Sequence, residues 1–566
     1  MAKSDPNRPG RVRAFKPKVS TGCRTCKVRR IKCDEAKPIC KKCSSTGRKC
    51  DGYFYSSILP ANSYQHNRPL IFDKQEIVKA TPSIDTFPSL TILKSSLEQR
   101  SFSFFQQNTV PQLSSIFGSP SWKQLNRLLL QAAHHEPAVR HAAVALGALH
   151  EHFETRSRLL PRSEDKSLST DFAVQQYVKA LGCLVNPTTG QKPAADVALI
   201  TCILFVCFEN LRGEYSMALS HINGGVKIIE EIAEIPDTPI SPGSPEFLSL
   251  SPTPSSSSSG SSLSVSPIPY VPLSTLSLVF IEFDVQASGL VNNRKRFLSA
   301  RKFDMPSSGY GPDIPTVFSS ADEACLALDH IRTEGVRMVD TVLRKQTPPD
   351  PQELRATLDL ILNTSSTRMK QWSQALDEFV SKNPNIKNER SILMLKMHHT
   401  FMKVNTAVGR IGLVTDECVF DTFLPDFREM ISLCTQIITT ESKLDRPRPM
   451  FCLDTGIIIA LFGVATKCRD GPTRWKAIDL LMSSDRQEGI LNSILTAGVA
   501  RRAIEIEETG LSQPVLMEDL PGERRLAGVE VKFEEIEKGA TVKFLRKPPF
   551  LGPPGPGDVI EEFFEW

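Results

Sequence analysis

The sequence predicts a mostly α-helical protein in which a small cysteine-rich module precedes a large, all-helical body. Six of the 14 cysteines fall within residues 23–50. Apolar residues then recur at helical spacing from about residue 101 to residue 508. A Ser/Pro-rich stretch at residues 236–270 interrupts this pattern. Its composition cannot bury a core, so we expect a disordered insertion between two helical parts.

Changes in composition predict the domain boundaries. They divide the 566 residues into a basic disordered arm (1–20), a cysteine-rich domain (21–53), a linker (54–95), a first helical part (96–235), the Ser/Pro-rich insertion (236–270), a second helical part (271–515), a short β-hairpin region (516–548) and an acidic-aromatic tail (549–566).

Charge is distributed unevenly along the chain. The net charge is +5, yet residues 1–50 alone carry +13, so the other 516 residues carry −8. A basic head on a mildly acidic body indicates a polyanionic partner for the head.

The start of the chain lacks the apolar stretch of a secretory signal, and the longest apolar run, Val197–Phe208, is about half of the roughly 20 residues that a membrane span needs. We therefore expect a soluble intracellular protein without membrane contact. In a reducing compartment, clustered cysteines favour metal binding over disulfides.

The six cysteines form an internal repeat with an offset of 17 residues and the spacing C-x2-C-x6-C in each half. The predicted zinc ligands are Cys23, Cys26, Cys33, Cys40, Cys43 and Cys50. A zinc ion takes four thiolates, so two ions need eight ligand positions, and six cysteines suffice if two sulfurs bridge both ions. Cys23 and Cys40 open the two halves and are the predicted bridges.

Metal coordination also explains how so short a segment can fold. Few apolar side chains accompany the cysteines, whereas a structural zinc site supplies about 10–16 kcal/mol. The alternatives are a disulfide knot, a catalytic zinc site and a metal store. A catalytic zinc would keep an open position that is not a cysteine.

Residues 22–50 (GCRTCKVRRIKCDEAKPICKKCSSTGRKC) resemble the fungal binuclear zinc-cluster transcription factors. Asp34 and Lys37-Pro38 belong to the match. The resemblance implies that the first and fourth cysteines bridge the metals, and that a nuclear regulator of RNA polymerase II promoters recognises CGG-type triplets in double-stranded DNA. It places the principal base-contacting residue at Arg30, with Arg29 as the second choice.

Lys27–Lys32 (KVRRIK) carries four cations in six residues and is predicted to be a short helix between zinc ligands. A basic helix fits the major groove, where Arg and Lys donate to guanine O6 and N7. We expect Lys27, Lys32, Lys41 and Lys42 to contact phosphates instead.

The body is predicted to be helical from the apolar period. Pro137 suits the first turn of a helix that continues through Phe153. Further helices are predicted at 172–184, 195–209, 214–234, 272–290, 321–345, 352–380, 390–412, 421–440, 454–467 and 473–508. Residues 101–153 also resemble the helical regulatory region of a large subclass of the fungal regulators.

Two residue groups in the body have the composition of a second metal site or a ligand-binding face, but both are predicted to be structural. Five histidines, interpreted as helix-surface residues, lie at positions 134, 135, 141, 150 and 152. Met394, Met397 and Met402 are predicted to be core residues. The sequence has no phosphate loop, nucleophile elbow or paired catalytic carboxylates, so it does not predict an enzyme.

Residues 54–95 contain four prolines and no sustained heptad repeat, so no coiled coil is predicted. A monomer and a homodimer formed through the helical body remain open. The insertion carries six Ser/Thr-Pro pairs, which are either phosphorylation sites or part of a tolerated loop.

Alternating residues at 529–534 and 541–545 predict a β-hairpin around Lys538-Gly539. The closing segment mixes acidic residues with Phe563, Phe564 and Trp566. Such a tail either binds a coactivator as an activation segment or docks on the body.

Overall fold

A computed structural model of the chain describes part of its residues. These are 25–26, 33–34, 36, 40–46, 50, 93–113, 120–156, 165–185, 194–233, 269–290, 313–343, 351–411, 416–443, 449–453, 455–534, 538–547, 555 and 557–566. The predicted basic arm, nearly all of the linker 54–95, the six Ser/Thr-Pro pairs and the insertion up to residue 268 lie outside them. The chain splits into two compact units, Met1–Pro69 and Leu70–Trp566.

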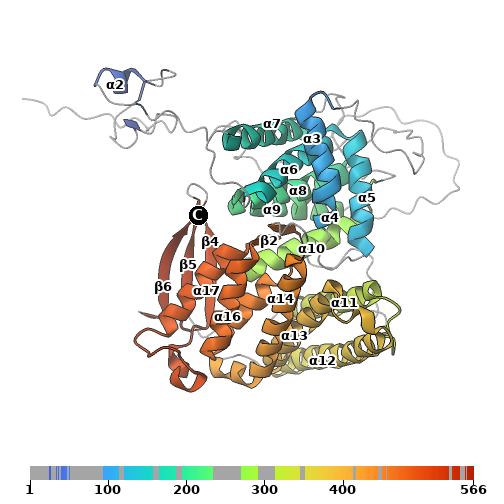
Figure 1. Ribbon diagram of the computed structural model, residues 1–566, viewed down its shortest axis with the longest axis vertical. Helices are drawn as coiled ribbons and strands as arrows, with labels where there is room; N and C mark the ends of the chain where they lie inside the picture. The colour runs from blue at the N-terminus through green and yellow to red at the C-terminus, as the bar shows by residue number, and fades with distance from the viewer. Residues whose placement is uncertain are drawn as a thin grey trace, which may run out of the picture. The chain divides into compact units, whose positions relative to one another are not determined.

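The second unit begins with a group of helices around one core (Figure 1). They are α3 (Ser96–Phe104), the π-helical turn η2 (Phe105–Thr109), α4 (Val110–Leu113), α5 (Pro120–His135), α6 (Pro137–Arg156), α7 (Asp165–Val185), α8 (Ala195–Arg212), α9 (Tyr215–Ala233) and α10 (Leu273–Leu290).

α6 lies at the centre of this group, against α3, α5, α7 and α8. The alanine side chains of α6 are small, so neighbouring helices can pack close to its backbone. At Gly147, α3 approaches so closely that a Cβ there would lie 2.1 Å from the carbonyl oxygen of Ser101. The apolar run of α8 is almost wholly buried against the same core. α6 begins at Pro137, so the predicted start of this helix is confirmed.

A second group of helices surrounds two further cores (Figure 1). They are α11 (Ala321–Leu343), α12 (Pro351–Lys382), η3 (Pro384–Ile386), α13 (Arg390–Ile411), η4 (Glu417–Phe423), α14 (Leu424–Ser442), α15 (Ile458–Lys467), α16 (Gly471–Ser484) and α17 (Ser493–Glu507), followed by the short turns η5 (Met517–Asp519) and η6 (Gly522–Arg524). Met394 and Met397 are fully buried and Met402 packs against a core, as predicted.

The mostly helical architecture is confirmed, but the body is not helical throughout. A sheet of order β1-β2-β3 combines β1 (Met450–Cys452), β2 (Arg486–Glu488) and β3 (Leu491–Asn492). β1 and β2 are parallel, and β2 and β3 are antiparallel. The single helix predicted at 473–508 is therefore wrong. Asp485 (φ 38°) and Gly489 (φ 53°) adopt left-handed conformations that end α16 and turn the chain.

The expected helix-surface position is wrong for one of the five histidines. His150 is fully buried, and its Nδ1 lies 2.9 Å from the Thr109 hydroxyl in η2. The π-helical turn lies beside α6 and brings this hydroxyl to the ring. Among the residues that the structure describes, no group of potential metal ligands contains a histidine.

The second sheet contains the predicted hairpin. β4 (Gly528–Phe533) and β5 (Gly539–Leu545) pair antiparallel, with Val531 opposite Val542. β6 (Val559–Glu565) pairs with the other edge of β5, so the tail docks, which is the second of the two predicted alternatives. Within the described part of the chain, no helix combines the length and apolar composition needed to cross a bilayer.

Two histidines, the buried His398 and the partly buried His221, make the stability of this body sensitive to pH. Desolvation lowers the pKa of His221 to about 4, and desolvation followed by the charge of Arg332 lowers the pKa of His398 to about 3. Below an ordinary histidine pKa of about 6.5 the unfolded chain binds more protons than the folded one, so stability falls as pH falls. We expect a loss of about 1.4 kcal/mol per pH unit for each histidine between pH 6.5 and pH 5.

Urea unfolding of the full chain at pH 7 and pH 5 measures this loss. The control is His221→Gln, because glutamine can still bond to the Tyr177 hydroxyl, 2.8 Å from the His221 ring, but cannot be protonated. Its free energy of unfolding should fall less between the two pH values than that of the wild type. An equal fall would contradict the prediction.

Candidate metal centre and nucleic-acid interface

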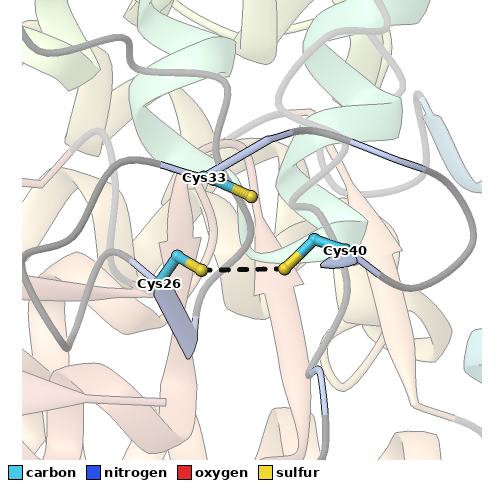
Figure 2. A group of neighbouring side chains, drawn as sticks. All are labelled: Cys26, Cys33 and Cys40. Atoms are coloured by element: carbon cyan, nitrogen blue, oxygen red, sulfur yellow. Dashed lines mark hydrogen bonds between the residues drawn. The ribbon is translucent and has the colours of Figure 1, made fainter. Parts of the chain in front are cut away.

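The described cysteines of the first unit gather their sulfur atoms into two overlapping groups. Cys26, Cys33 and Cys40 form one group, and Cys40, Cys43 and Cys50 form the other. Within each group all sulfur atoms lie within 4.8 Å of one another. Figure 2 shows the first group, with the three side chains pointing toward a common centre. Cys40 belongs to both groups.

The distances between sulfurs fit zinc. The Cys26 sulfur lies 3.7 Å from that of Cys40, which belongs to the same group. A tetrahedron with zinc–sulfur bonds of about 2.3 Å has edges of about 3.8 Å. A disulfide bond would need about 2.05 Å. Cys26, Cys40 and Cys43 are wholly buried, so the thiolates are shielded from water at the centre of the module.

A short helix positions the second group. Cys40 precedes α2 (Lys41–Ser44), and its sulfur accepts a hydrogen bond from the backbone N–H of Cys43 at 3.3 Å. The C-x-x-C spacing therefore places the second sulfur one helical turn after the first. An amide donor at a thiolate stabilises its negative charge.

Asp34 connects the two halves of the module. Its carboxylate accepts the backbone N–H groups of Lys41 at 3.0 Å and Lys42 at 3.2 Å. Desolvation would raise the pKa of Asp34, but these bonds hold that pKa below its ordinary value. The segment after the third cysteine is thereby fixed to the helix after the fourth. The sequence pattern contains Asp34, but spacing alone does not reveal that it caps α2.

The predicted DNA contacts fall partly within the described residues. Lys41 and Lys42 are the first residues of α2, and both side chains are exposed. The other predicted site residues lie outside the described part of the chain: Cys23, Lys27, Arg29, Arg30 and Lys32.

Both units match known families. Residues 21–57 match the fungal Zn(2)-Cys(6) binuclear cluster domain, and residues 100–506 match the fungal specific transcription factor domain. The chain belongs to the fungal transcription factors that carry the fungal specific transcription factor domain. The second match contains nearly all of the helical body.

Relatives point the same way. The chain is 25% identical to the aspercryptin biosynthesis cluster-specific transcription regulator atnN of Emericella nidulans, over 96% of this chain and 95% of that protein. It is 31% identical to the transcription regulator lscL of Purpureocillium lilacinum, over 36% of this chain and 48% of that protein. The transcriptional regulatory protein moc3 of Schizosaccharomyces pombe is 49% identical over 9% of this chain and 10% of its own length. No solved structure matches.

The module and the family together identify the general function. The cluster domain binds zinc, and the chain is a DNA-binding transcription regulator. Its family and these relatives are regulators and not enzymes.

Replacing Asp34 tests its role in the module. Asp34→Ala removes both carboxylate acceptors at the start of α2, so we expect the full chain to release zinc to a chromogenic chelator faster than the wild type. Asp34→Asn keeps one acceptor oxygen and should release zinc at an intermediate rate. Equal release rates for all three chains would contradict this role.

Proposed function

We propose that the chain recognises CGG-type triplets in the major groove, using the basic segment Lys27–Lys32 on a two-zinc cluster. The carrying observation is that Cys40 belongs to two groups of three sulfurs. One sulfur shared between two such groups is what a bridged pair of ions requires. The family resemblance of residues 22–50 supplies the triplet.

The proposed ligand set completes both groups with Cys23. One ion is held by Cys23, Cys26, Cys33 and Cys40, and the other by Cys23, Cys40, Cys43 and Cys50. Cys23 is one repeat of 17 residues before Cys40, which supports an equivalent bridging role. Six thiolates and two zinc ions sum to about −2, which the surrounding Lys and Arg residues more than offset.

In the proposed complex Arg30 donates to a guanine of the triplet, with Arg29 as the alternative. Lys27 and Lys32 contact phosphates. Lys41 and Lys42 are also assigned to phosphates, because their exposed side chains begin a helix whose first amides already bond to Asp34. These amides are therefore occupied, and only the side chains remain for DNA.

The remaining assignments concern the whole chain. We assign it to the nucleus and keep the boundaries 21–53 for the DNA-binding domain, 96–235 and 271–515 for the two helical parts, 516–548 for the hairpin region and 549–566 for the tail. A homodimer formed through the helical body would place two triplets at a fixed spacing.

A relative suggests the class of target genes. The Emericella nidulans relative is named as specific for one biosynthesis cluster, and its alignment spans 96% of this chain. We propose that this chain also controls one cluster of biosynthetic genes. Chromatin immunoprecipitation would find its sites concentrated in neighbouring promoters, whereas sites scattered among unrelated genes would reject this target class.

Binding of zinc-loaded full chain to a random duplex pool tests the triplet. Wild type should enrich CGG. Arg30→Ala should lose about 1–3 kcal/mol of discrimination at one base pair. Lys42→Ala should weaken binding to all duplexes alike and reduce the salt slope by about 0.9.

Recovery of no motif, with affinity for all duplexes that disappears as salt rises, would reject the triplet. It would favour a scaffold that contacts DNA without sequence preference.

Counting zinc ions tests the bridges. Native mass spectrometry of the full chain should find two ions in the wild type. Cys40→Ser should lose both, because it removes a ligand from each group. Cys43→Ser is the matched control, since it removes a ligand from one group only, and it should keep one ion. A Cys40→Ser chain that keeps one ion would contradict the shared sulfur.

A further inference from the structure

Apart from Gly555, the residues of the predicted acidic-aromatic tail that the structure describes are 557–566, and most of them form β6. β6 is the outermost strand of the second sheet (Figure 1). Its register runs from Leu545 opposite Val559 to Gly539 opposite Glu565. No side chain of β6 is fully buried, whereas β5 buries Val542 and Phe544 completely. Two side chains of β6, Ile560 and Phe564, are partly buried and pack against the core that contains Val542 and Phe544.

Most acidic side chains of the segment are paired with cations of the body. Arg502 of α17 bonds to both carboxylate oxygens of Glu562, at 2.7 to 3.0 Å. Lys543 lies 3.3 Å from Glu561, and Lys547 lies 3.1 Å from Asp558. Three of the four acidic residues from 558 to 565 therefore have a cationic partner within the same chain.

The aromatic end of the segment is also engaged. The Trp566 indole N–H donates to the carbonyl oxygen of Gly213, at 3.0 Å, in the turn between α8 and α9. Its ring meets Tyr215 and Phe533 at centroid distances of 5.5 and 6.0 Å. Gly213 (φ 72°) permits this turn, and a Cβ there would lie 3.1 Å from the Trp566 nitrogen.

The groups that a coactivator would bind are therefore the groups that the body binds. An acidic-aromatic segment associates with a basic, apolar groove through its carboxylates and its aromatic rings. In the docked state these carboxylates and the Trp566 ring have partners within the chain. One segment cannot satisfy both sets of contacts, so docking and coactivator binding exclude each other.

We propose that residues 557–566 are an activation segment which the body holds inactive as strand β6, and that release from β5 lets the segment bind a coactivator with a basic, apolar groove. Release breaks no fully buried ion pair, and it separates Ile560, Phe564 and Trp566 from the apolar residues on which they pack. An edge strand without a fully buried side chain opens at a lower free energy than the core helices. The proposal rests on the regulatory role of the chain and not on the DNA sequence that it recognises.

A charge reversal tests the tether. The full chain is fused to an unrelated DNA-binding domain, and a reporter carries sites for that domain, so the result does not depend on the triplet. Arg502→Glu should raise reporter output several-fold, because two carboxylates then repel each other. The double variant Arg502→Glu/Glu562→Arg restores an ion pair and should return output to the wild-type level. Arg502 is partly exposed, so the change needs no repacking.

Hydrogen exchange on the purified full chain gives the structural readout. Amides of residues 559–566 should exchange faster in Arg502→Glu and at the wild-type rate in the double variant. Amides of α6 and α8 should keep their protection in both, which excludes general unfolding. Lys547→Glu, with Lys547→Glu/Asp558→Lys as its rescue, repeats the test at an independent tether if Arg502→Glu disturbs α17.

Faster exchange and higher output that return together in the rescued chains would support the proposal. Faster exchange without any change in output would overturn it, because the released segment would then have no activating role. Unchanged exchange with unchanged output at both tethers would overturn the release mechanism.

Discussion

The cysteine module depends on one constraint, namely that a single sulfur serves two groups of ligands. Cys40 lies within 4.8 Å of the sulfurs of Cys26 and Cys33 and also of Cys43 and Cys50. The two halves are therefore coupled through this sulfur, and the module has few apolar side chains that could order it in another way. Asp34 reinforces the same connection by bonding to the first amides of α2. Zinc, when bound, supplies the folding free energy, and the protein supplies the geometry and the basic surface.

In the helical body, a buried carboxylate likewise connects several elements. Glu488 is fully buried in β2, and its carboxylate accepts the backbone N–H groups of Gly456, Ile457 and Ile458 at the start of α15. It also pairs with Arg486, which in turn pairs with Glu441 on α14. Removing either partner would leave an uncompensated charge in the interior. Gln286 of α10 donates to the carbonyl of Leu453, the residue after β1, and this contact links the first group of helices to the second.

The tail contacts both groups of helices. A sheet packed on α17 holds the segment that has the composition of an activation region, and Trp566 reaches the turn between α8 and α9. A change in either group of helices could thus alter how firmly the segment is held. In the mechanism that we propose, the helical body and the tail form one regulatory unit that the cysteine module delivers to DNA.

The sequence by itself determined the family and most helices and predicted the cysteine ligands, because these depend on local spacing. Metal ligands repeat at fixed offsets, and amphipathic helices repeat an apolar period. Only the tertiary structure decided where long-range contacts override that period. The apolar pattern of 473–508 continues through Ile490 and Leu491, yet left-handed residues at 485 and 489 divide it into two helices and a strand pair. Likewise, neither the burial of His150 nor the choice between a free and a docked tail follows from local pattern, since each depends on partners distant in the chain: His150 on Thr109 and Phe451, and the tail on Arg502 and Gly213.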